Sequence, residues 1–117
     1  MNNESILISI KKLIGIEPDY MHFDTDLIIH INTVLSVLYQ LGIGKKAFSI
    51  ADSTATWEDF LGDSIENLND VKTYVALRVR LMFDPPSNSS ATESFKQIIS
   101  ELEWRINVTV DPGEIQK

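Results

Sequence analysis

The sequence contains no cysteine, which excludes a disulfide framework, thiolate catalysis and cysteine-bound zinc. No apolar run approaches the ~20 residues of a membrane-spanning helix, and no signal peptide is recognisable. Basic residues are few, because 10 Lys and Arg stand against 17 Asp and Glu, and this acidity argues against wrapping a nucleic-acid backbone. We therefore expect one small soluble domain, whose 117 residues are enough for a core without cross-links.

The spacing of apolar residues predicts a mainly α fold, a small bundle of four main helices. The first helix covers residues 5–14, and the second covers residues 27–41 with one apolar arc. The third begins after a cap at Ser64 or Asn67 and ends at Phe83, where two prolines follow. The fourth begins at Ser90 and ends near Val110, and its expected core stripe is Phe95, Ile98, Ile99, Leu102 and Ile106. Residues 1–110 are expected to form a single domain, and residues 111–117 a flexible tail.

Polar residues at the expected helix ends predict specific caps. Asp24, Thr25 and Asp26 are expected to supply N-cap oxygens to the second helix, and Ser90 with Glu93 predicts a capping box for the fourth. Lys11 and Lys12 fall in the last turn of the first helix, where cations suit the helix dipole.

Residues 45–57 interrupt the helical pattern between the second and third helices. Two short β-prone stretches flank Asp52-Ser53, which predicts a short β-hairpin or an extended loop. Thr56 and Asp59 predict a capping box for one further helical turn, residues 58–61.

A cluster of His22, Asp24, Asp26 and His30 has the ligand types of a hydrolytic metal site. Its spacing matches no recognised metal motif, and the two aspartates already have a role as helix caps. There is no glycine-rich phosphate loop and no nucleophile-elbow serine. A protein without enzymatic activity, metal or cofactor is therefore the expectation, with a small metal-dependent hydrolase as an alternative.

Acidic residues are concentrated in residues 47–71, which contain no Lys or Arg. The run includes Asp52, Glu58, Asp59, Asp63, Glu66 and Asp70, so six of the seven net negative charges fall in this stretch. Such a run is an ordinary solvated face, a surface that repels nucleic acid, or a surface that meets a basic partner.

Four apolar or charged side chains do not fit a simple core. Ile29 and Val37 point away from the apolar arc of the second helix, and Trp104 points away from the stripe of the fourth. Arg78 falls within the apolar face of the third helix, where it must snorkel, stack on Tyr74 or pair with a carboxylate. Burial against another part of the chain or against a neighbouring subunit would explain each of them.

In the order and spacing of its segments the sequence resembles the small head–tail connector proteins of tailed bacteriophages, also called adaptor or head completion proteins. The resemblance spans about residues 5–106 and is carried by residues 10–16, 22–26, 40–44, 55–57, 60–62, 71–75, 83–86 and 100–105. It implies a helical, non-enzymatic virion protein that assembles in the host cytoplasm.

The resemblance also implies partners and surfaces. Such proteins form a ring, of about a dozen copies, beneath the portal protein, and are often monomers in isolation. The ring extends the channel for duplex DNA and docks a head-completion stopper or tail protein, with no membrane involved. Ile29, Val37, Arg78 and Trp104 are then expected at subunit contacts, and Asp52, Glu58, Asp59 and Asp63 at the channel. The segment expected to engage the portal comprises Val110, Asp111, Pro112, Gly113, Glu114, Ile115, Gln116 and Lys117. The alternative from a different class is a small acidic protein-interaction module, such as a DNA mimic or a regulatory partner of a basic protein.

Overall fold

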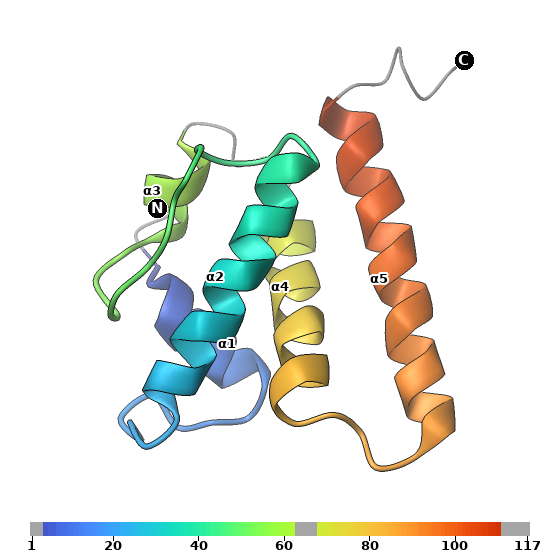
Figure 1. Ribbon diagram of the computed structural model, residues 1–117, viewed down its shortest axis with the longest axis horizontal. Coiled ribbons are helices and arrows are strands. Elements are labelled where there is room, and N and C mark those ends of the chain that lie inside the picture. Colours follow the sequence, from blue (N-terminus) through green and yellow to red (C-terminus); the bar gives the residue numbers. More distant parts are fainter. Residues whose placement is uncertain (1–3, 63–67, 111–117) are drawn as a thin grey trace.

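The computed structural model describes residues 4–62 and 68–110, which form a mainly helical bundle (Figure 1). The helices are α1 (Ile6–Leu13), α2 (Asp24–Gln40), α3 (Trp57–Leu61), α4 (Leu68–Phe83) and α5 (Ser89–Val110). The expected mainly α fold is therefore confirmed. In the described part of the chain, no helix combines the length and the apolarity that a membrane span requires.

Helices α2 and α4 form the centre of the bundle, and α1 packs against both. The apolar arc of α2 is buried as its spacing predicts, and so is one face of α4. Helix α5 packs mainly on α4, on the side away from α1 (Figure 1). Its buried residues are Ile99, Leu102 and Ile106, whereas Ile98 is 43% exposed. The prediction of Ile98 as a core residue is therefore wrong, because α5 packs mainly on one helix and buries a narrow stripe.

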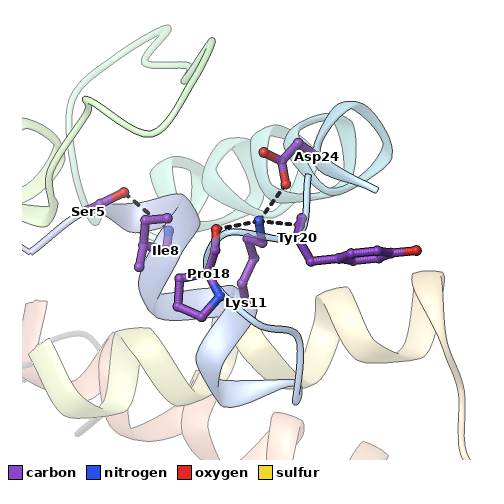
Figure 2. Close-up of polar contacts among 6 residues, drawn as sticks. All are labelled: Ser5, Ile8, Lys11, Pro18, Tyr20 and Asp24. Atoms are coloured by element: carbon purple, nitrogen blue, oxygen red, sulfur yellow. Dashed lines mark hydrogen bonds and ion pairs between the residues drawn. The ribbon is translucent and has the colours of Figure 1, made fainter. Parts of the chain in front are cut away.

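A buried lysine fastens the connector between α1 and α2 (Figure 2). The side chain of Lys11 is completely buried, and its Nζ donates to Pro18 O at 3.0 Å and to Tyr20 O at 2.7 Å. It also donates to Asp24 Oδ1 at 2.8 Å, at the first residue of α2. A buried ammonium is tolerated only when such acceptors replace water. Lys11 lies in the last turn of α1, as expected, but its ammonium is buried and bonded to the connector and to Asp24.

Two predicted caps also differ from the structure. Helix α2 has Phe23 at its cap position without a side-chain hydrogen bond, because the carboxylate of Asp24 turns to Lys11. Helix α5 begins at Ser89, and Asn88 Oδ1 accepts a hydrogen bond from the Ala91 amide at 2.7 Å. Asn88 therefore occupies the capping role assigned to Ser90.

Residues 45–56 form an extended loop and not a hairpin. The loop is fixed to α2 by Asn32, whose side chain accepts from the Ile50 amide at 2.7 Å and donates to Ile50 O at 3.0 Å. Its end forms an isolated bridge between Thr56 and Ser5. The loop thus pairs with a side chain and with the N-terminal segment instead of with itself.

Helix α3 has the predicted capping box. The side chain of Thr56 accepts from the Asp59 amide, and Asp59 Oδ2 accepts from the Thr56 amide. The helix is anchored by Trp57, whose Nε1 donates to the buried Ser9 Oγ of α1 at 2.8 Å.

Replacing Lys11 by methionine is expected to lower the free energy of unfolding by about 3 kcal/mol, because two carbonyls and a carboxylate lose their shared donor. Lys12→Met is the matched control, since Lys12 is the exposed neighbour in the same helix, and it should change stability by less than about 0.5 kcal/mol. Denaturant titrations of both variants give the comparison. Equal stability losses would contradict the role assigned to Lys11.

Candidate interaction groove

A groove of about 390 Å³ lies between α2 and α5, with α4 at its base. We call it the α2–α5 groove. Its lining residues are Thr33, Val34, Val37, Arg78, Leu81, Met82, Lys96, Ile99, Ser100 and Glu103. It exists because α5 packs mainly on α4, which leaves the facing sides of α2 and α5 unpaired (Figure 1). Side chains of another helix or of a partner chain would complete the packing of this groove.

The four residues predicted for subunit contacts all lie on or beside this groove. Val37 and Arg78 line it directly. Ile29 is one helical turn before Thr33, and it is 58% exposed. Trp104 is one turn beyond Ser100, and it is 59% exposed, so no other described element covers it. The groove thus has an apolar interior bordered by two exposed hydrophobic side chains.

Arg78 interacts with groups of its own chain. Its guanidinium lies 5.5 Å from the centre of the Tyr74 ring, and Nη1 is 3.5 Å from Glu103 Oε2. The Tyr74 hydroxyl donates to the same Glu103 oxygen at 2.7 Å. Both charged side chains are about one-third exposed, so the pair stabilises the fold only modestly. Stacking and pairing, two of the roles open to Arg78, therefore occur together, and the network joins α4 to α5.

The electrostatics of this network centre on a buried phenol. Burial raises the pKa of the Tyr74 hydroxyl well above its ordinary value, and the hydrogen bond to Glu103 raises it further. The positive charge of Arg78 opposes this shift. Tyr74 consequently remains a neutral hydrogen-bond donor that holds α5 on α4.

Three of the four acidic residues predicted for a channel surface are described, and all three are exposed. The carboxylate of Asp52 accepts hydrogen bonds from the hydroxyl and from the backbone amide of Thr54. These bonds hold the pKa of Asp52 below its usual range, and the hydroxyl bond has the larger effect. Asp59 belongs to the α3 capping box, and Glu58 is its neighbour. Figure 1 shows α3 and the preceding loop on the opposite side of α2 from α5. Asp63 lies outside the described residues.

The segment predicted to engage a portal begins where α5 ends. Val110 is the last residue of α5, and residues 111–117 lie outside the described part of the chain. The His–Asp cluster gives the hydrolase alternative no support, because Asp24 is bonded to Lys11 and His22 packs against Phe23. Within residues 4–62 and 68–110, no three His, Asp or Glu side chains lie close enough together to hold a metal ion.

Several groove residues were not identified from the sequence. Lys96 and Ser100 precede Trp104, which was predicted as a subunit contact, at four-residue spacing, so that the three form one row on the surface of α5. That row was the available signal. Met82, which is 42% exposed in the groove, gave none, because its position within the apolar face of α4 is that of an ordinary core residue.

Tyr74→Phe is expected to reduce the loss of stability at high pH. The ordinary tyrosine pKa is 10.0 and the folded value is higher, so above about pH 10 the unfolded chain releases a proton that the folded chain keeps. The free energy of unfolding therefore falls as the pH rises through this range. Denaturation at about pH 8 and about pH 11 should show a smaller decrease for Tyr74→Phe than for the wild type or the exposed-site control Tyr39→Phe. An equal decrease in all three proteins would contradict this.

Comparison with known proteins gives one match, to the family described as phage connector protein, over residues 6–113. No curated protein and no solved structure matches the chain. The matched range begins at the first residue of α1 and includes all five helices and the groove between α2 and α5. The chain therefore belongs to the phage connector protein family.

Proposed function

We propose that the chain is a structural head–tail connector of a tailed phage, without enzymatic activity. In this role, copies form a ring beneath the portal protein, extend the DNA channel and dock the next head-completion stopper or tail protein. The family match over residues 6–113 carries the proposal. The protein would then be a component of the virion, assembled in the host cytoplasm.

The α2–α5 groove supports the assembly part of the proposal. Ile29, Met82 and Trp104 place large hydrophobic side chains in water on or beside one groove, which is typical of a surface that is covered in an assembly. A closed ring uses heterologous contacts, in which one patch meets a different patch on the next copy. The groove would be one of these two patches.

The acidic side of the molecule suits contact with a DNA channel. Exposed Asp52, Glu58 and Asp59, with Asp63 beyond the described residues, would repel phosphates, so that duplex DNA slides without attachment. In a ring that uses the groove between neighbours, this side of α2 remains available to the lumen or its rim. Residues 110–117, at the end of α5, would engage the portal.

Light scattering of the purified chain, alone and mixed with the portal protein of the same phage, tests this proposal. The expected result is a monomer alone and a defined multimer on the portal. Trp104→Ala should weaken that multimer by about tenfold or more in the concentration needed, because it removes a large apolar contact. Tyr39→Ala is the matched control, since Tyr39 is an exposed aromatic that does not line the groove.

The acidic interaction module predicts a different result. It would show no association with the portal at any salt concentration and would bind a basic protein through residues 47–71 instead. That outcome would overturn the connector proposal.

A further inference from the structure

The connector between α1 and α2 exposes an unusual apolar tip. Met21 is 71% exposed and Tyr20 is 50% exposed. We call residues 17–21 the knob. Isolated exposed hydrophobic side chains are ordinary, but two large ones in succession on one connector are typical of a contact surface.

The knob is held in a fixed conformation. Lys11 donates to the carbonyls of Pro18 and Tyr20 (Figure 2). The Tyr20 amide also donates to Glu17 O at 3.0 Å. The Tyr20 ring also packs edge-on against Phe23, with the ring centres 5.7 Å apart. A surface already fixed in its bound shape loses little entropy on docking. The buried lysine therefore serves to present Tyr20 and Met21 as well as to close the connector.

The charges of the knob are complementary to those of the α2–α5 groove. Glu17 and Asp19 are exposed beside Tyr20 and Met21. Two cations, Arg78 and Lys96, and one carboxylate, Glu103, line the groove around its apolar base. Arg78 is paired with Glu103, whereas the ammonium of Lys96 is 60% exposed and lies 3.8 Å from Glu93 on its own helix. The exposed Lys96 is therefore the cation that an acidic apolar tip would meet at the border of the groove.

We propose that the knob of one copy docks into the α2–α5 groove of a second copy, an inference that rests on the proposed ring. Tyr20 and Met21 would cover the apolar base, and Glu17 and Asp19 would lie on the side of the exposed Lys96. In Figure 1 the connector lies at the N-terminal end of α2, on the side away from α5. The knob and the groove are therefore distinct surfaces of one copy. Contacts of this kind repeat from copy to copy and can close a ring.

Two other surfaces of a second copy fit the groove less well. The acidic loop and α3 (residues 45–61) expose no large hydrophobic side chain to fill an apolar base. The outer face of α5 exposes one large hydrophobic side chain, Ile98, and the carboxylate of Glu101 on that face is paired with Arg105. The knob combines two exposed hydrophobic side chains with two carboxylates, and neither alternative has this combination.

The absence of cysteine makes disulfide trapping a direct test. Thr33→Cys places a thiol at the groove, and His22→Cys places one beside an intact knob. A concentrated mixture of the two single variants, exposed to a mild oxidant, should yield a cross-linked dimer that contains one of each. Thr33→Cys mixed with Ser53→Cys is the control, because Ser53 is exposed on the loop that lies on the other side of α2 from α5, and it should yield no such product.

Exchanging the charges of the groove and the knob in the same assay tests whether opposite charges hold the two surfaces together. Adding Lys96→Glu to the Thr33→Cys chain should slow cross-linking about tenfold, because the groove then repels the acidic knob. Adding Glu17→Lys to the His22→Cys chain should restore the rate. Thermal unfolding of each variant checks that the fold is retained.

Three results would overturn the inference: a homodimer of Thr33→Cys alone, which means that groove faces groove; equal product with the Ser53→Cys control; or no mixed product either free or on the portal. Because trapping detects weak contacts in the free chain, it does not depend on portal binding. A multimer on the portal without knob–groove cross-links would reject this contact and leave the connector role standing.

Discussion

The ammonium of Lys11 is the interaction on which the arrangement of the bundle depends. It is fully buried, and its three acceptors come from the connector and from the first residue of α2. It therefore fixes where α1 ends and the direction in which α2 begins, and α2 in turn supplies the main surface on which α4 packs. A hydrophobic side chain of similar length would bury as much area but would leave the two carbonyls and Asp24 without a donor. The three hydrogen bonds of Lys11 thus fix the conformation of the connector, which burial of a hydrophobic side chain would not do.

The candidate site follows from an unequal distribution of packing. The buried residues of all five helices form one core, but the described part of α5 contributes only Ile99, Leu102 and Ile106 to it, and the Tyr74–Glu103–Arg78 network also joins α5 to α4. This attachment leaves a groove instead of a closed four-helix bundle. In the described residues every buried side-chain nitrogen and oxygen has a partner, so the polar groups of the core are satisfied. The large hydrophobic side chains that remain exposed to water include several on or near the groove and two at the α1–α2 connector.

The helices and their core faces were predictable because periodicity reports burial locally. The arcs of α2 and α4, the capping box of Thr56 and the outward direction of Trp104 follow from spacing along one helix. Contacts between distant segments were not predictable. Nothing near Lys11 indicates that its acceptors lie 7 to 13 residues away, or that Asn32 pairs with Ile50 in place of a hairpin. At α5, four cap-competent residues (87–90) stand in a row, and only the path of the preceding turn selects Asn88. The groove likewise depends on the packing angle of α5, which no single segment encodes.

The surface combines two opposing tendencies, and their balance suits assembly on a template. Exposed side chains such as Met21 and Trp104 favour association, whereas a net charge of −7 favours separation of free copies. A single small contact is weak under these conditions. Copies held side by side on a portal would meet at a high effective concentration, where the same contact becomes intramolecular in character and closes readily. Weak contacts would therefore let the proposed ring close on its template, whereas a larger hydrophobic interface would also join free copies.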